Sequence, residues 1–248
     1  MTHRPIPVVA AMVAVLVCTG CSGSPGRPKS NSEIIAPNQV IDFNLLYGQN
    51  CAGCHGASGG GGAAIALANP VFLAIADDSV IRRTAATGVP GTPMPAFAQA
   101  AGGMLTDKQI DALVNGIRSW AKVDVLVNNA TPPPYFSQMP GNPQRGAEAY
   151  RTYCSSCHGG DGRGGNKASS IVNGAYLALV SDQELRTIVI AGRPELGAPD
   201  WRGNVEGRPM SAEEISDVVA WLSAHRTQSQ VSHTRFLLRS GTKGAFDE

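Results

Sequence analysis

The sequence has no apolar run long enough to cross a membrane. A transmembrane helix needs about 20 consecutive apolar residues, and the uncharged apolar run at residues 6–17 is shorter. Neither sign of charge predominates, since the sequence has 20 Lys and Arg and 19 Asp and Glu, which gives a formal net charge of +1. No basic patch is present, which argues against nucleic-acid binding. No segment alternates apolar and polar residues as strands do, so helices are the predicted structure.

Cysteine is scarce, and four of the six cysteines lie in two copies of one motif, at residues 51–55 (C-A-G-C-H) and 154–158 (C-S-S-C-H). This spacing is typical of c-type haem attachment, in which the cysteines form thioethers and the histidine ligates iron. A zinc site needs four ligands and each cluster supplies three. Neither motif lies in the βαβ pattern of thioredoxin-like sites. The sequence therefore predicts two covalently bound haem c groups, held by Cys51, Cys54, Cys154 and Cys157, with His55 and His158 as iron ligands.

Residues 1–20 have the features of an export signal, because a weakly basic start precedes the apolar run and small residues follow it. The ending at residues 18–21 (C-T-G-C) resembles the cleavage box of bacterial lipoproteins, although Cys18 stands where that family usually has leucine. The resemblance implies lipidation of Cys21 as the first residue of the mature chain. The alternative is an ordinary cleaved signal with a free Cys21. Lipidation would leave no free thiol, which suits an oxidising compartment.

Residues 21–38 are rich in Ser, Gly, Pro, Lys and Arg and predict a flexible tether. A covalent lipid attaches a protein to a membrane without a spanning segment. We therefore expect an exported protein, lipid-anchored to a bacterial membrane, whose globular part lies in the periplasm or on the outer surface.

The two motifs belong to an internal repeat with an offset of 103, from residue 51 to residue 154. Tyr47 and Tyr150 each precede the first motif cysteine by four positions. The glycines that follow the first motif recur after the second at the same offset: Gly56, Gly59, Gly61 and Gly62 match Gly159, Gly162, Gly164 and Gly165. The repeat predicts two haem domains, at residues 39–122 and 144–226.

Between these domains, residues 123–143 form a proline-rich linker. Three consecutive prolines in it favour a stiff, extended chain. After the second domain, the apolar periodicity is lost in a C-terminal tail at residues 227–248.

The clearest predicted helices begin at two capping boxes, Thr106 with Gln109 and Ser211 with Glu214. Apolar residues follow each box at the spacing that buries one helix face. Shorter helices are predicted between each motif and its capping box, at residues 78–86 and 181–191. The predicted architecture is all-α, in two tandem domains.

Residues 40–121 and 144–225 resemble class I cytochromes c. The resemblance rests on a helix that runs into C-x-x-C-H, a methionine loop, and a last helix that crosses the first. It implies that a methionine sulfur is the sixth iron ligand. Met94 fits this role in the first domain, since it lies 39 residues after His55 between Pro93 and Pro95. The alternative for Met94 is a packed core residue, because methionine fills gaps easily.

The second domain departs from the family pattern, because Ala198 stands where the repeat places the methionine. Met210, the only methionine after His158, is the predicted ligand. Two alternatives remain: Met210 packs on Ile215 as a hydrophobic staple and leaves the iron open or water-bound, or another side chain ligates. His3, His225 and His233 are expected to be non-ligands.

A haem with histidine and methionine ligands has no vacant site, and the neutral sulfur raises its reduction potential. We therefore expect an electron carrier rather than an enzyme. It would link a quinol-oxidising complex or periplasmic dehydrogenase to a terminal oxidase or reductase. The alternatives are a peroxidase-like or small-molecule-binding enzyme that uses an open second haem, and a cytochrome subunit fixed in a larger respiratory complex.

Overall fold

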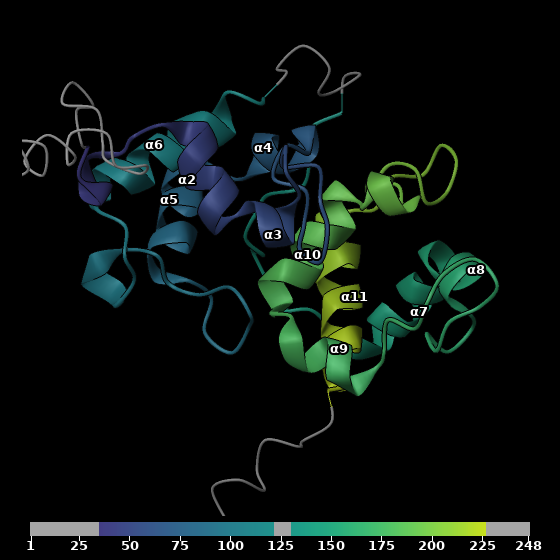
Figure 1. Ribbon diagram of the computed structural model, residues 1–248. Coiled ribbons are helices and arrows are strands. Elements are labelled where there is room, and N and C mark those ends of the chain that lie inside the picture. Colours follow the sequence, from purple (N-terminus) through teal and green to yellow (C-terminus); the bar gives the residue numbers. More distant parts are fainter. Residues whose placement is uncertain (1–34, 122–129, 227–248) are drawn as a thin grey trace, which may run out of the picture. The chain divides into compact units, whose positions relative to one another are not determined.

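The computed structural model describes residues 35–121 and 130–226 (Figure 1). The predicted signal peptide, Cys21, most of the tether, the first part of the linker and the tail lie outside the described residues. The chain divides into two compact units, Met1–Gln39 and Val40–Glu248. The described part of the first unit contains one 3-10 turn, η1 (Pro37–Gln39).

The described residues form helices and three isolated β-bridges but no sheet, which confirms the all-α prediction. The helices up to residue 121 in the second unit are α2 (Phe43–Asn50), α3 (Ala52–His55), α4 (Pro70–Ile75), α5 (Asp78–Thr87), η2 (Gln99–Ala101) and α6 (Asp107–Arg118). The helices from residue 130 onward are α7 (Pro143–Tyr153), α8 (Ser155–His158), α9 (Gly174–Leu179), α10 (Asp182–Ala191), η4 (Pro194–Leu196) and α11 (Ala212–Ala224). We call the helices up to residue 121 the first series and those from residue 130 onward the second series. The elements of the second series follow the same order as those of the first.

Both predicted capping boxes are present. The Thr106 hydroxyl accepts from the backbone N–H of Gln109, and the Gln109 side chain accepts from the N–H of Thr106. The same reciprocal bonds join Ser211 and Glu214 at the start of α11. Each box satisfies N–H groups that have no partner inside the helix. The apolar stripes that follow are buried: Ile110, Leu113, Val114 and Ile117 in α6, and Ile215, Val218, Val219 and Leu222 in α11.

Aromatic rings and a glycine join the first helix of each series to the last. The Trp120 ring, just after α6, lies 5.0 Å from the Tyr47 ring of α2, centroid to centroid. In the second series the rings of Tyr150 and Trp221 stack at 4.2 Å. Gly146 of α7 lets the backbones approach closely, since a Cβ atom there would lie 2.0 Å from the Asp217 carbonyl oxygen. These contacts hold in place the helix that precedes each C-x-x-C-H motif, which is α2 in the first series and α7 in the second.

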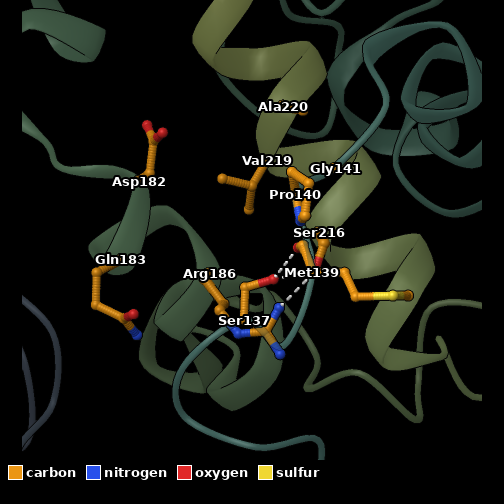
Figure 2. Close-up of a pocket in the computed structure, with 10 residues that line it drawn as sticks. All are labelled: Ser137, Met139, Pro140, Gly141, Asp182, Gln183, Arg186, Ser216, Val219 and Ala220. Carbon is orange, nitrogen blue, oxygen red and sulfur yellow. Dashed lines mark hydrogen bonds between the residues drawn. The ribbon is translucent and has the colours of Figure 1, made fainter.

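The described half of the predicted linker packs against α10 and α11. Arg186 of α10 is 2% exposed, and its guanidinium donates to the carbonyls of Pro134 and Tyr135 and to the Ser216 hydroxyl. Figure 2 shows Ser137, Arg186 and Ser216 converging beside a cavity of about 210 Å³. Arg186 therefore binds the second half of the linker to these two helices.

Among the described residues, no helix has the length and hydropathy needed to cross a membrane.

Candidate haem-attachment sites

Each C-x-x-C-H motif forms one short helical turn directly after the first helix of its series. Cys51 ends α2, where its N–H donates to the Tyr47 carbonyl at 2.8 Å, and the His55 N–H donates back to Cys51 at 3.0 Å. The turn of α8 has the same bonds at the equivalent positions. All four motif cysteines are free thiols. The turn thus carries both cysteines and the histidine on one short rigid element.

Both motif histidines are oriented by a backbone carbonyl. Nδ1 of His55 lies 2.8 Å from the Ile65 oxygen, and Nδ1 of His158 lies 2.7 Å from the Ser169 oxygen. A carbonyl accepts but cannot donate, so Nδ1 carries the hydrogen and Nε2 has the free lone pair. A histidine that binds a metal through Nε2 is held in this way.

His55 is 8% exposed, and this burial is the main cause that lowers its pKa. Its bond to Ile65 raises the pKa, and the charge of Arg193 lowers it. Because the pKa lies below that of a free histidine, which is about 6.5, the imidazole is neutral at pH 7. The neutral ring is the form that binds iron.

Burial also raises the pKa of the Cys51 thiol to about 11 and that of Cys154 to about 12. The charge of the second cysteine in each motif raises both values further. The raised pKa leaves the first cysteine of each motif as a neutral thiol at pH 7.

The tyrosines and glycines of the repeat support the motif turns. The Tyr47 hydroxyl donates to the Gly56 carbonyl at 2.8 Å, and Tyr150 donates to Gly159 in the same way. Gly56 has φ +82°, and a Cβ there would lie 2.5 Å from the Gly61 oxygen. The N–H groups of Gly61 and Gly164 donate to the carbonyls of the motif histidines, both at 2.9 Å. The offset of 103 found in the sequence is thus preserved in the hydrogen bonds.

Met94 lies in a loop held by main-chain bonds rather than by packing. Its carbonyl accepts from Val89 at 3.0 Å, and its N–H donates to the Thr92 hydroxyl at 3.2 Å. The side chain is half-buried and is not among the described residues that form or flank the hydrophobic core. This placement favours the ligand role over the core role, because a core methionine would contact that cluster.

Ala198 is the structural counterpart of Met94. A Cβ on Gly88 would lie 2.6 Å from the carbonyl carbon of Pro95, and a Cβ on Gly192 would lie 2.6 Å from that of Pro199. Because these two close approaches match, the residues just before the prolines, Met94 and Ala198, occupy equivalent places.

Met210 is the counterpart of Leu105. The N–H of Leu105 donates to Phe97, and the N–H of Met210 donates to Trp201 at 2.9 Å. Met210 is 2% exposed and belongs to the hydrophobic core. The structure thus places Met210 at the staple position before the Ser211 cap, apart from the place that Met94 occupies in the first series.

The residues fit covalently attached haem. Free thiols at the attachment spacing share one turn with a histidine whose Nε2 is available, and this holds at both motifs. The carbonyls of Ile65 and Ser169, which orient the histidines, could not be found from the sequence, since every residue type has such a group. Arg193, which reaches the first motif loop from the second half of the chain, was also missed for lack of any local pattern.

Several known proteins are similar to this chain. Three curated relatives, each described as a cytochrome bc1 complex cytochrome c subunit, come from Mycobacterium bovis and two strains of Mycobacterium tuberculosis. They are 24% identical over 181 residues, which is 71% of this chain and 60% of the relative. The chain thus spans less than two thirds of these relatives. A chain of the Kuenenia stuttgartiensis reducing HAO-like protein complex aligns with a TM-score of 0.42 and 19% identity, covering 78% of this chain and 100% of that one.

The model of one protein family matches two separate segments, residues 39–115 and 141–222, and each contains one C-x-x-C-H motif. That family is described as cytochrome c oxidase, cbb3-type, subunit III. The matched segments cover more than half of the chain. The chain therefore belongs to the cbb3-type subunit III family of c-type cytochromes.

Proposed function

We propose that this chain carries two covalently bound haem c groups and transfers single electrons between membrane redox complexes. The repeated histidine geometry carries the proposal. His55 and His158 each end a motif turn and each are bonded at Nδ1 to a backbone carbonyl, so both present Nε2. The cysteines of the same turns would hold the two porphyrins: Cys51 and Cys54 the first, Cys154 and Cys157 the second.

The bound haem supplies a one-electron iron couple, and the protein sets which oxidation state is favoured. The carbonyl bonds to Nδ1 fix each imidazole and increase its basicity as a ligand. Met94 is the proposed distal ligand of the first haem. Its neutral sulfur favours ferrous iron and raises the potential. With His55 and Met94 as its ligands, the first haem would serve as an electron carrier and would not bind substrate.

We further propose that a lipid on Cys21 and the tether at residues 21–38 hold the exported globular part at a bacterial membrane. The relatives are named as subunits of a bc1 complex, which supports a quinol-oxidising complex as electron donor, with a periplasmic dehydrogenase as the alternative. A terminal oxidase or reductase would be the acceptor. Redox encounters commonly bury small interfaces, and a tether compensates by keeping the partners near one another.

One observation favours a second candidate function at the second haem. Ala198 stands in the place of Met94, and Met210 stands in that of Leu105. If Met210 stays in the core, the second iron keeps an open position that can bind a small molecule or reduce peroxide. The ligand role predicted from the sequence requires instead that the sulfur of Met210 reach the second iron.

The carrier role is tested in membranes that lack the chain and are then supplied with it. We expect quinol to reduce both haems, and the wild-type chain to restore electron flow to the terminal oxidase. The Cys154→Ala/Cys157→Ala variant should fail to do so, because it lacks the second haem. Haems that stay oxidised while the oxidase turns over at full rate would refute the proposal. Copurification from detergent-solubilised membranes separates a fixed subunit, which stays with its complex, from a free shuttle.

A further inference from the structure

Arg193 lies in the loop after α10, in the half of the chain that carries the second motif, yet its side chain contacts the loop of the first motif. Its Nη2 donates to the Gly62 carbonyl at 2.7 Å. Gly62 belongs to a loop that folds back on the first motif, because the N–H of Ala64 donates to the Cys54 carbonyl at 3.0 Å. The guanidinium is thus bonded to the segment that surrounds the first haem-attachment turn.

The main chain of Arg193 is paired at the same time with Ala198. The N–H of each residue donates to the carbonyl of the other, both at 3.0 Å. Ala198 holds the place in the second half that Met94 holds in the first. One residue therefore joins the distal loop of the second haem site to the attachment loop of the first.

Glu195 completes this contact. Its carboxylate forms an ion pair with Arg193, and the two side chains are only 24% and 13% exposed. The carboxylate packs on Gly61, where a Cβ atom would lie 2.6 Å from its Oε1. Gly61 has φ +96°, a conformation that favours glycine, so the residue type at position 61 leaves room for the acid.

A second, fully buried bond lies on the same pair of segments. The Asn69 side chain donates from Nδ2 to the Ala191 carbonyl at 2.9 Å, which joins the start of α4 to the end of α10. Asn69 is 7% exposed and also caps α4 through its side-chain oxygen. The ion pair thus belongs to a packed contact and is not an isolated surface pair.

Both charges lie beside the residue that would bind the first iron. Arg193 bonds to Gly62 and Glu195 packs on Gly61, and the N–H of Gly61 donates to the His55 carbonyl at 2.9 Å. A nearby cation disfavours added positive charge, and the same rule applies to an iron held by His55. Ferric haem carries one more positive charge than ferrous haem. Arg193 should therefore favour the ferrous state and Glu195 the ferric state, each charge being partly screened because Glu195 is an exposed residue.

We propose that the Arg193–Glu195 ion pair joins the two haem sites and sets the reduction potential of the first haem relative to the second. The proposal rests on haem attachment at His55, as proposed above. The two charges act in opposite directions on one haem, so changing either of them alone shifts the partition of an electron between the two haems.

The test is a potentiometric titration, haem by haem, of the holoprotein and of the Arg193→Gln and Glu195→Gln variants. Arg193→Gln should lower the potential of the first haem, and Glu195→Gln should raise it. Each change should alter the electron partition by about threefold to tenfold, as expected for a partly screened unit charge. Arg193→Lys keeps the charge and should stay close to wild type. If Arg193→Gln does not fold, the other two variants still decide the question.

Arg163→Gln is the matched control, because Arg163 also pairs with a nearby acid, Asp161, but their side chains are 81% and 66% exposed. It should leave both potentials unchanged. Unshifted potentials in Arg193→Gln and Glu195→Gln would overturn the proposal, and so would shifts of the same sign, which indicate a loosened contact rather than a charge effect. Failure of the proposed function is distinguishable, since a haem count in the unmutated protein would then fall below two.

Discussion

Ala198 occupies in the second half of the chain the place that Met94 occupies in the first. Gly88 and Gly192, at φ +66° and +70°, make matching close approaches to the prolines that follow these two residues. The two loops therefore share a backbone path, while their side chains differ between a thioether and a methyl group. Since a methyl group cannot bind iron, the two proposed haem sites would differ in the ligand that this loop can supply.

The first prediction is two covalent haems per chain. Pyridine-haemochrome assay and intact mass should both give two for protein matured with a competent haem-attachment system. The Cys154→Ala/Cys157→Ala variant should keep one, because each motif turn holds its own thiols. A single haem in the unmutated protein would contradict the repeat as interpreted here.

Lipidation of Cys21 is the second prediction. Cys21→Ser should release the protein from membranes or block its processing, because the hydroxyl of serine cannot take the thioether-linked lipid. Membrane fractionation and intact mass measure the two outcomes. Mature protein that is soluble and has an unmodified Cys21 would show an ordinary signal peptide instead.

Met94→Ala is predicted to change the first haem and to leave the fold mostly intact, since the side chain is half-buried outside the core. The weak near-infrared band that accompanies sulfur bound to ferric iron should lose the contribution of this haem. Its potential should fall, because sulfur ligation favours the ferrous state. The matched control is Met104→Ala, since Met104 is 82% exposed. Met104→Ala should change neither the near-infrared band nor the potential. If Met94→Ala also leaves the spectrum unchanged, Met94 is a packing residue and not a ligand.

The crossing of α7 and α11 gives a prediction for stability. Gly146→Ala places a Cβ 2.0 Å from the Asp217 carbonyl oxygen, so the helices must separate. We expect a loss of about 1–3 kcal/mol in the free energy of unfolding, the usual cost of overpacking. Gly48→Ala in α2 is the control, because a Cβ there meets nothing within 4 Å. It should gain up to about 1 kcal/mol from helix propensity. Denaturant unfolding measures the free energy of unfolding of both variants. Equal changes in the two variants would contradict the close approach of α7 and α11.

The elements that could be predicted from the sequence are those fixed by neighbouring residues. A capping box needs only Thr106 and Gln109, and an attachment turn needs only five consecutive residues, so their patterns are local. The all-α fold follows from such patterns repeated at one offset. The structure adds the burial that these patterns imply, for example Ile110 and Ile215 at 0% exposure.

What could not be predicted depends on residues far apart in the chain. The Arg193–Gly62 bond spans 131 positions and the Asn69–Ala191 bond spans 122. Neither leaves a local pattern. The place of Met210 is different, because the two capping boxes already align it with Leu105 in the sequence, and its backbone bond to Trp201 agrees with that alignment. The alignment does not fix whether its sulfur serves as an iron ligand or as a staple.

The last prediction concerns the distal side of the second haem. Met210 packs in the core directly before the Ser211 cap, where a hydrophobic staple to Ile215 is expected. Leucine preserves that contact and cannot bind iron. From this packing we expect Met210→Leu to leave the spectrum and potential of the second haem unchanged. That haem would then already bind carbon monoxide in the unmutated protein, because the methyl group of Ala198 could not supply a sixth ligand.

Ala198→Met is the complementary variant, because it places a thioether at the position equivalent to Met94. It should convert the second haem to a low-spin form with a new near-infrared band, abolish carbon monoxide binding and raise the potential. The two variants together separate the two roles of Met210. If Met210→Leu instead creates a high-spin, carbon-monoxide-binding haem, then Met210 is the ligand predicted from the sequence, and the loop from Gly192 must rearrange when haem is attached. The second haem would then be a second carrier site with both axial positions filled, and the enzyme alternative would be excluded.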